Sequence, residues 1–459
     1  MRKVIVIGLD CAAPQLVFDA WREELPNIKS LVERGVWGKL RSTDPPITVP
    51  AWMSMLTSKN PGRLGFYGLR NRVDYSYTKM SIPNSMQVKE PTVWQILSER
   101  GKRCIVIGVP QTYPPRPLNG YLVSCFLTPS TKNDYTYPVD FKREVEQVTG
   151  GYILDCDNFR TDEKQRILDQ IFAMTQKRFR LAEYCLSSKP WDFFIMVEMG
   201  IDRIHHGFWK YMDKTHPKHE PGNPFENVIK DYYKFCDEQI GSLLRFADGD
   251  TTVMVVSDHG ARKMDGGICI NEWLIKEGYL VLKEWPSTPQ PIEKCMVDWE
   301  KTKAWGSGGY YARLMINVKG REPQGVVALA EYESLRAELI SKLEAIPSPD
   351  GRKMRTRVVR PEDVYPEVRN IPPDLFVYFD DLNWRSVGSV GSGEIYTFEN
   401  DTGPDDANHD WYGIFVMAEA GRSQSVYRDD LDIKDVAPTI LHQMGIEVPK
   451  DMEGKVIQG

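Results

Sequence analysis

Short, nearly unbroken runs of apolar residues recur along the chain. The clearest are residues 4–7, 104–107, 193–197 and 252–256. Apolar runs without alternation are typical of strands buried on both faces, as in a parallel sheet covered by helices. Helix-like stretches separate them, for example 27–34 before Gly35 and 91–100 before Gly101. This order of elements predicts a doubly wound, mostly parallel α/β core.

The pattern changes in the middle of the chain. Between residues 272 and 373, a strand-like stretch (310–318), a polar helix (331–345) and another strand (355–359) are separated by Pro and Gly breaks. We interpret residues 272–373 as an α+β insertion.

The remaining parts of the chain, residues 1–271 and 374–459, are then the two parts of the core. Residues 375–379 and 413–417 have the apolar character of strands that return to the main sheet. Residues 435–441 open a C-terminal helix that is expected to end near Gly445.

Composition narrows the class of protein. With 459 residues, 41% hydrophobic and 27% charged, the chain has an ordinary globular composition and is too long for a single compact core. Its net charge of −6, without a long Lys/Arg run, predicts no nucleic acid polymer as partner. The scattered cysteines indicate reduced core thiols: Cys11, Cys104, Cys125, Cys156, Cys185, Cys236, Cys269 and Cys295.

No stretch has the length of a membrane span or of a signal peptide, so we expect cytoplasmic localisation. The sequence does not indicate the oligomeric state.

Three apolar runs each lead within a few residues to potential metal ligands. Asp10 follows the first run, Asp202 and His206 follow the third, and Asp258 and His259 follow the fourth. Because sites in open α/β sheets form at the carboxyl ends of the strands, we expect these residues to converge. The spacing of Asp202 and His206, four residues apart, places both on one face of a helical turn.

The ligand types indicate the metal. Carboxylates with imidazoles suit zinc or manganese better than calcium, which prefers oxygen ligands, or an iron–sulfur cluster, which needs thiolates. Zinc is the first choice. Taken singly, Asp10 and Asp258 are also compatible with helix caps, and His206 with an ordinary core histidine. Together with His409, one of only seven histidines, they form the set that a dinuclear site needs.

Thr48 is a candidate nucleophile. Pro50 fits the first position of a helix over residues 51–57, which places Thr48 just ahead of the helix start, where free amides and the dipole favour negative charge. A Thr hydroxyl needs a base or a metal to lose its proton, and two cations roughly 3.5 to 4 Å apart would clamp the attacking and leaving oxygens. The alternative is that Thr48 only caps the helix.

Five motifs occur in a fixed order along the chain. They are Gly8-Leu9-Asp10, Thr48-Val49-Pro50-Ala51-Trp52, Asp202-Arg203-Ile204-His205-His206, Ser257-Asp258-His259-Gly260 and Asn408-His409-Asp410. In these motifs the chain resembles the type I phosphodiesterase and nucleotide pyrophosphatase branch of the alkaline phosphatase superfamily. The resemblance implies an alkaline-phosphatase-like fold and two Zn²⁺ ions, with Mn²⁺ as the alternative metal.

The resemblance also implies a role for each site residue. Asp202, His206 and His409 would hold one zinc, and Asp10, Thr48, Asp258 and His259 the other. Thr48 would attack phosphorus and form a phosphoryl- or nucleotidyl-threonine, which water then hydrolyses. The expected function is a phosphodiesterase or nucleotide pyrophosphatase acting on a phosphorylated small molecule.

Some positions depart from the family pattern. Ala51 stands where nucleotide pyrophosphatases have Asn, and His205 stands where a Gly is expected. A phosphomonoesterase, a phosphonate hydrolase, a mutase and a non-catalytic phospho-ligand binder therefore remain alternatives. Thr48 disfavours sulfatase chemistry, because Thr cannot become formylglycine. We expect the nearby cations Arg203, Arg262 and Lys263 to be solvated. The nearby aromatic residues Trp52, Phe66 and Tyr67 are expected to pack in the core rather than to stack on substrate.

Overall fold

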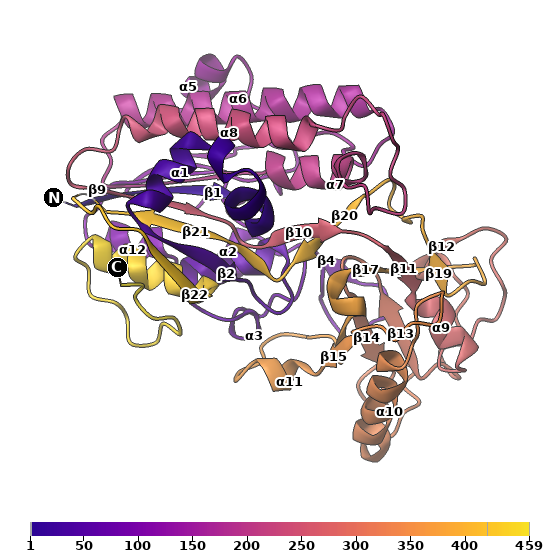
Figure 1. Ribbon diagram of the computed structural model, residues 1–459. Helices are drawn as coiled ribbons and strands as arrows, with labels where there is room; N and C mark the ends of the chain where they lie inside the picture. Colours follow the sequence, from indigo (N-terminus) through magenta and orange to yellow (C-terminus); the bar gives the residue numbers. More distant parts are fainter. Residues whose placement is uncertain (1, 420, 459) are drawn as a thin grey trace.

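A nine-stranded sheet forms the centre of the protein (Figure 1). The computed structural model describes residues 2–419 and 421–458. The order of strands is β22-β2-β21-β9-β1-β8-β5-β6-β7. Their bounds are β1 Lys3–Leu9, β2 Val36–Arg41, β5 Cys104–Ile107, β6 Gly120–Val123, β7 Thr136–Tyr137, β8 Phe193–Glu198, β9 Thr251–Val256, β21 Tyr412–Ala418 and β22 Val426–Asp432.

The middle of the sheet is parallel, as the apolar runs predict. Strand β1 pairs in parallel with β8 on one side and β9 on the other, and β5 pairs in parallel with β8 and β6. Every residue of β5, β8 and β9 is buried, which explains the absence of alternation in their sequences. Antiparallel pairing is confined to β21, which pairs with β9 and β2, and to the edge strand β7.

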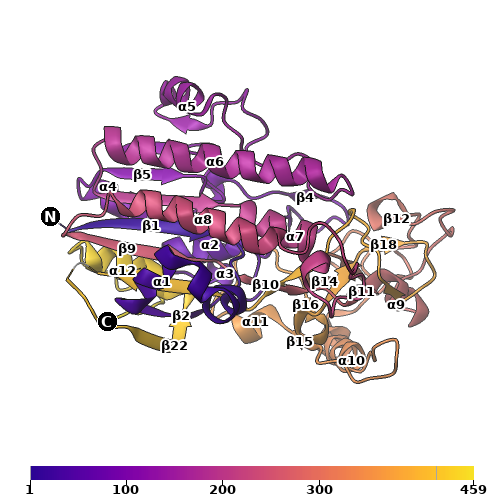
Figure 2. The same cartoon turned by 45° about the horizontal axis from the view of Figure 1, so that its top comes forward.

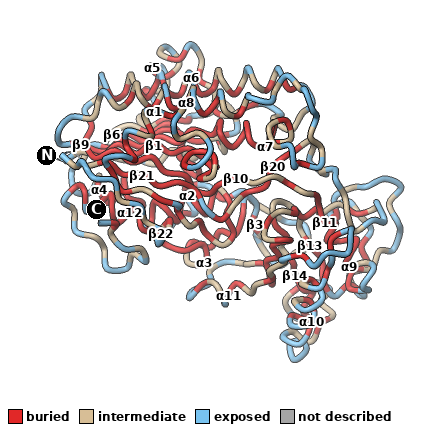
Figure 3. The backbone as a smooth tube through the Cα atoms, in the orientation of Figure 1, coloured by how far each residue is buried: buried red, intermediate tan, exposed pale blue. Residues whose placement is uncertain are grey.

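Helices cover both faces of the sheet (Figures 1 and 2). On one face α1, α6, α7 and α8 pack together, and on the other α2, α4 and α12. The buried residues gather between these layers (Figure 3). The helices of the core are α1 Pro26–Glu33, α2 Thr48–Thr57, α3 Pro61–Leu64, α4 Val93–Glu99, α5 Phe141–Thr149, α6 Lys164–Ser188, α7 Gly200–Met212, α8 Val228–Leu244 and α12 Val436–Gln443. The doubly wound α/β core is thus confirmed.

A second, smaller unit lies beyond one end of the main sheet (Figures 1 and 2). It contains the sheets β13-β14-β16-β15 and β17-β11-β19 and has its own hydrophobic cluster, which extends from Ile268 to Val390. Its elements are β11 Gly266–Cys269, α9 Ile270–Lys276, β13 Ala304–Ser307, β14 Ala312–Ile316, α10 Tyr332–Glu344, β15 Arg357–Val359, α11 Pro361–Val364, β16 Leu375–Tyr378, β17 Trp384–Val387 and β19 Tyr396–Thr397.

One strand lies in a different sheet from the one predicted. Residues 375–379 were expected to return to the main sheet, but β16 pairs antiparallel with β14 and β15 of the smaller unit. A short apolar run satisfies either burial environment, so the sequence pattern does not distinguish the two sheets. Residues 413–417 do return to the main sheet, within β21. The boundaries at residues 272 and 373 stay a prediction.

Two further expectations concern the whole chain. All eight cysteines are free, and seven are buried. Among the helices of the described residues, none has both the length and the apolarity to cross a membrane.

Candidate active site

The predicted ligands converge at the carboxyl ends of three neighbouring strands. Strands β9, β1 and β8 are adjacent in the sheet. Asp10 directly follows β1, Asp258 and His259 follow β9, and β8 leads into α7, which carries Asp202 and His206 on successive turns. Topology therefore brings together residues that are more than 240 positions apart in the sequence.

The fourth stretch of the site comes from the C-terminal part of the chain. His409 lies on β20 (Ala407–Asp410), which pairs antiparallel with β10 (Gly260–Lys263) and sets His409 opposite Ala261. Two groups of buried ligand atoms result, Asp202 with His206 and His409, and Asp10 with Asp258 and His259. Within each group these atoms lie within 4.8 Å of one another. These are the two groups that the resemblance implied, although their role as ligands stays a prediction.

Unsatisfied polar atoms show that these groups fit divalent cations. Among the described residues, Asp10 Oδ1, Asp202 Oδ1, His206 Nε2 and Asp258 Oδ2 are buried without a hydrogen-bond partner. A buried polar atom without a partner costs about 1–3 kcal/mol, so four of them in one place need an explanation. Carboxylate oxygens and imidazole nitrogens are ligands of zinc and of manganese, and coordination would satisfy all four.

In each of the three histidines, the ring nitrogen Nδ1 contacts a hydrogen-bond acceptor outside the ligand group. The Nδ1 atom of His206 lies 2.7 Å from Asp405 Oδ1, that of His259 lies 3.1 Å from the Gly260 carbonyl, and that of His409 lies 2.9 Å from the Pro46 carbonyl. Because these partners only accept, each Nδ1 carries a proton, and Nε2 is the nitrogen that is directed into the site. Such outer contacts fix both the ring orientation and the tautomer that a metal ligand requires.

The carboxylates are held in the same way. The Trp52 indole donates to Asp10 Oδ2 at 2.6 Å, and the Cys11 amide donates to Asp258 Oδ1 at 3.2 Å. Arg203 donates to Asp202 Oδ2. In each case one oxygen is held while the other stays free. Trp52, predicted to pack in the core, is fully buried and also positions Asp10.

Asp405 contacts the candidate site, although the sequence did not indicate it. Besides His206, it accepts hydrogen bonds from Arg160 Nε at 3.0 Å and Arg385 Nη1 at 3.2 Å. The only available signal is an acidic residue in a loop four positions before His409, and acidic loop residues are too common to single it out.

The electrostatics of the ligand groups indicate missing positive charge. Burial, followed by the charge of a neighbouring carboxylate, raises the pKa of Asp10 and of Asp258 well above the ordinary value. Burial lowers the pKa of His259 to about 4. For His206 burial acts in the same direction, but the charges of Asp405 and Asp202 outweigh it and raise the pKa to about 9. Cations would offset the mutual repulsion of the buried carboxylates.

Thr48 is the first residue of α2, and its hydroxyl lies beside this cluster. The N-cap of the helix is Ile47 and no side chain caps it, so the helix starts earlier than the predicted 51–57, and Pro50 is the third residue instead of the first. Thr48 Oγ1 lies 3.3 Å from His259 Nε2. Thr48 is therefore not the residue that caps this helix, so the alternative that it serves only as a cap is excluded. The amides of Thr48 and Val49 belong to the first turn, where no intrahelical acceptor exists.

Thr48 lines a pocket of about 260 Å³ that lies between the core and the smaller unit. The lining residues are Ile47, Thr48, Val49, Leu69, Phe126, Asp155, Phe159, Arg160, Met199, Asp202, Arg203, Tyr310 and His409. The expectation that Arg203 is solvated was wrong, since it is buried and donates to Asp155 at 2.9 and 2.7 Å. Arg262 and Lys263 are half-buried and pair with Asp410 and Asp265, at 2.6 and 2.8 Å. Phe66 and Tyr67 are buried in the core, as expected.

Tyr310 is the contribution of the smaller unit to this pocket. Its ring stacks on His206 with centroids 4.9 Å apart and lies 4.0 Å from the ring of His409. Its hydroxyl accepts a hydrogen bond from Arg160 at 2.6 Å. Nothing in the local sequence around residue 310 indicated this position.

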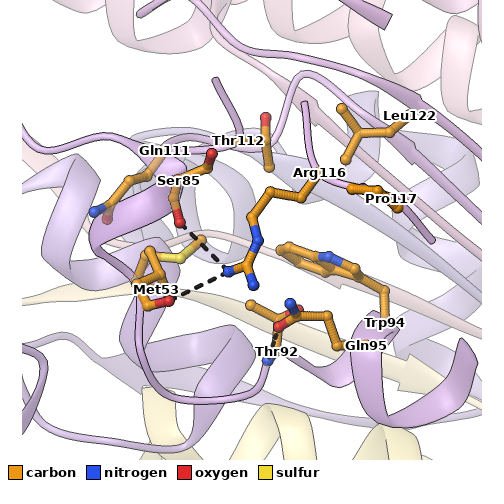
Figure 4. A pocket seen from close by; sticks show the side chains of 11 residues that line it. Met53, Ser85, Thr92, Trp94, Gln95, Gln111, Thr112, Arg116, Pro117 and Leu122 are labelled. Atoms are coloured by element: carbon orange, nitrogen blue, oxygen red, sulfur yellow. Dashed lines mark hydrogen bonds between the residues drawn. The ribbon is translucent and has the colours of Figure 1, made fainter. Parts of the chain in front are cut away.

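A separate hollow near α4 is too small to be a substrate site. Its volume is about 20 Å³, and Arg116 extends into it between Met53, Trp94 and Gln111 (Figure 4). Arg116 donates to the carbonyls of Ser85 and Val88 at 3.5 and 3.3 Å. Space for about one water molecule remains, and none of the predicted ligands lines it.

The sequence profile of the family described as "Type I phosphodiesterase / nucleotide pyrophosphatase" matches residues 4–405. The chain belongs to this family. The match spans the core up to residue 405, the smaller unit and every predicted ligand except His409. Membership supports hydrolysis of phosphoester bonds. A comparison with curated protein sequences gave no match.

Solved structures of this superfamily share the fold. Human ectonucleotide pyrophosphatase/phosphodiesterase 5 has 13% identity and a TM-score of 0.58, with 99% of this chain and 97% of that chain covered. An inactive form of the murine protein, in complex with AMP, has 13% identity and a TM-score of 0.56, with 98% and 96% covered. Phosphonoacetate hydrolase from Sinorhizobium meliloti 1021, in complex with phosphonoformate, has 15% identity and a TM-score of 0.61, with 97% and 96% covered. At these identities the likeness concerns the fold.

Proposed function

We propose that this chain is a metal-dependent phosphodiesterase or nucleotide pyrophosphatase in which Thr48 is the nucleophile. The observation that supports this proposal most strongly is the position of the Thr48 hydroxyl, 3.3 Å from His259 Nε2 and in the pocket that Asp202 and His409 also line. We assign Asp202, His206 and His409 to one cation, and Asp10, Asp258, His259 and Thr48 to the other. The mixed nitrogen and oxygen donors favour zinc, with manganese as the alternative.

The chain's own groups supply orientation and electrostatic stabilisation. Divalent cations, when bound, would lower the pKa of the Thr48 hydroxyl and polarise the phosphoryl group. Thr48 Oγ1 attacks phosphorus, the leaving group departs with the electrons of its P–O bond, and water later cleaves the phosphothreonine. The free amides at the start of α2 are available to donate to the phosphoryl oxygens of a bound substrate, and the helix dipole favours their charge. These amides fill the role of the Asn that is replaced here by Ala51.

The names of the structural neighbours support the substrate class. The murine neighbour, described as inactive with a threonine replaced by alanine, is in complex with AMP. The phosphonoacetate hydrolase is in complex with a phosphonate. Both ligands are phosphorus-containing small anions, and we propose a substrate of this kind for this chain. A nucleic acid polymer remains an unexpected partner at a net charge of −6.

Replacement of Thr48 tests the proposal. The metal-loaded protein should bind about two Zn²⁺ per chain and hydrolyse bis-(p-nitrophenyl) phosphate, and Thr48→Ala should abolish turnover while it retains metal. Thr57→Ala is the matched control, because Thr57 lies in the same helix and donates only to the Met53 carbonyl. Undiminished turnover by Thr48→Ala would refute the nucleophile. Metal and ligand binding without turnover in the wild type, on diesters, monoesters and phosphonates alike, would favour a non-catalytic binder.

A further inference from the structure

Two arginines line the pocket beside Thr48, and each is held in a fixed orientation. Arg203 donates to both oxygens of Asp155 and to Asp202 Oδ2. Arg160 donates to Asp405 and to the Tyr310 hydroxyl. The ring of Phe159 lies between them, with its centroid 4.4 Å from the Arg203 guanidinium carbon and 4.5 Å from that of Arg160. Guanidinium groups held in this way lose little entropy when they bind an anion.

The balance of charge around the pocket leaves room for an anion. Five carboxylates surround it or its ligand groups: Asp10, Asp155, Asp202, Asp258 and Asp405. Arg160 pairs with Asp405, and Arg203 pairs with Asp155 and Asp202. Arg385 contacts Asp405 from outside the pocket. Two divalent cations and three guanidinium groups would carry seven positive charges against the five negative charges of the carboxylates. Without the guanidinium groups, the five carboxylates would outweigh the four charges of the cations.

We propose that Arg160 and Arg203 form an anion subsite that selects substrates with a second negative charge at or next to the reacting phosphoryl group. The inference rests on the proposed function and adds to it the class of substrate. A simple phosphodiester carries one negative charge and uses only the cations and the α2 amides. A phosphomonoester carries its second charge on the reacting phosphoryl group, and a phosphoanhydride carries it on the neighbouring phosphate. Both place charge within the pocket that the two arginines line.

The structure offers a matched pair of arginines for the test. Arg160 and Arg385 both donate to Asp405 Oδ2, at 3.0 and 3.2 Å, but only Arg160 lines the pocket. Arg160→Gln and Arg385→Gln therefore remove the same kind of support from Asp405. They differ in whether a charge is lost from the pocket, and Arg160→Gln also removes the donor to the Tyr310 hydroxyl. Tyr310→Phe removes that contact without a loss of charge and separates the two effects. If loss of an arginine changes activity only because Asp405 then holds His206 less well, both arginine variants should show the same change in activity.

The first measurement is substrate preference. For the wild type and both variants, kcat/KM is measured on bis-(p-nitrophenyl) phosphate, p-nitrophenyl phosphate and ADP, with metal content checked for each preparation. We expect Arg160→Gln to lower the ratio of p-nitrophenyl phosphate or ADP to the diester by about tenfold or more, which is the loss of one charge-assisted hydrogen bond. Arg385→Gln should leave the ratio unchanged. A drop with p-nitrophenyl phosphate alone assigns the second charge to the reacting group, and a drop with ADP alone assigns it to the neighbouring phosphate.

The second measurement does not depend on turnover. In a metal-loaded Thr48→Ala background, inorganic phosphate should bind about tenfold more weakly after Arg160→Gln, and also after Arg203→Lys, which keeps the charge but loses the planar guanidinium donors. Metal content is measured for each variant, because Arg203 also donates to Asp202. Calorimetry gives these affinities directly. Equal phosphate affinities and equal substrate ratios in all variants would overturn the anion subsite. Absence of turnover of every substrate by the metal-loaded wild type, with normal phosphate affinities, would instead overturn the proposed function.

Discussion

The contact between Asp405 and His206 permits a test of the metal centre that leaves every predicted ligand in place. Asp405 accepts from His206 Nδ1 at 2.7 Å and from Arg160 and Arg385 on its other oxygen. Asp405→Asn keeps the size of the side chain but removes its charge. If the Asn oxygen faces His206, the amide NH₂ group faces the two guanidinium groups. All of these groups are donors, so the hydrogen bonds to Arg160 and Arg385 are lost. The opposite rotamer would offer a donor to Nδ1 and favour the proton on Nε2, where it blocks coordination.

Either rotamer weakens the cation group of Asp202, His206 and His409. Loss of such an outer partner typically reduces metal affinity about 10- to 100-fold, which corresponds to about 1.4–2.7 kcal/mol. Competition with a chromogenic chelator measures this directly, and two sites of different affinity should be resolved. We expect only one of the two to weaken, because the group of Asp10, Asp258 and His259 makes no contact with Asp405 among the described interactions.

The neighbouring residue provides the control. Asp406 is also buried, but its carboxylate makes no contact with a predicted ligand among the described residues, and burial raises its pKa to about 7. Asp406→Asn should bind both cations with affinities within about threefold of the wild type, a difference well below 1 kcal/mol. Wild-type affinity at both sites in Asp405→Asn would refute the reasoning that Asp405 fixes the His206 tautomer.

Three further predictions concern stability. Zinc at 100 times its dissociation constant should stabilise the metal-free protein by about 2.7 kcal/mol for each occupied site, seen as a higher Tm, and the double variant His206→Ala/His259→Ala should lose this gain. In the metal-free protein the raised pKa of His206 means that its protonated form stabilises the fold below the ordinary value of 6.5, and that this contribution disappears as the pH rises to about 9. Urea unfolding at pH 7 and pH 9 should therefore show a loss of stability that is smaller in Asp405→Asn, and an equal loss would contradict the assignment. Trp52→Phe leaves Asp10 Oδ2 without its donor and should lower the free energy of unfolding by about 1–3 kcal/mol, measured by the urea midpoint, whereas an unchanged midpoint would show that the indole contact contributes nothing.

The sequence predicted those parts of the protein that follow from local patterns and strand order. Continuous apolar runs identified β1, β5, β8 and β9, and the rule that sites form at carboxyl strand ends brought Asp10, Asp202 and Asp258 together. Pairing that depends on distant partners was not accessible. The run in β16 fits either sheet, because the pattern records burial and not the neighbouring strand.

The outer contacts of the site escaped prediction for a related reason. Asp405, Arg160 and Tyr310 lie in loops or between strands, where no periodicity constrains them, and their roles depend on which side chains meet across the fold. Arg203 was expected to be solvated from the general behaviour of arginine, but it is buried and pairs with Asp155. A residue with no local signal can thus be as closely tied to the site as a motif residue.

Through Tyr310 the smaller unit packs against the predicted metal ligands and also forms a wall of the pocket. Its ring covers His206 and His409, and its carbonyl accepts a hydrogen bond from Asn408 at 3.0 Å, next to the ligand itself. Water at this position would raise the local dielectric and weaken the attraction between the ligand carboxylates and a bound cation. A chain without the smaller unit would therefore keep the ligand residues but expose one of their two groups to solvent. The same tyrosine also meets Arg160, so the smaller unit contacts the metal ligands and the proposed anion subsite through one side chain.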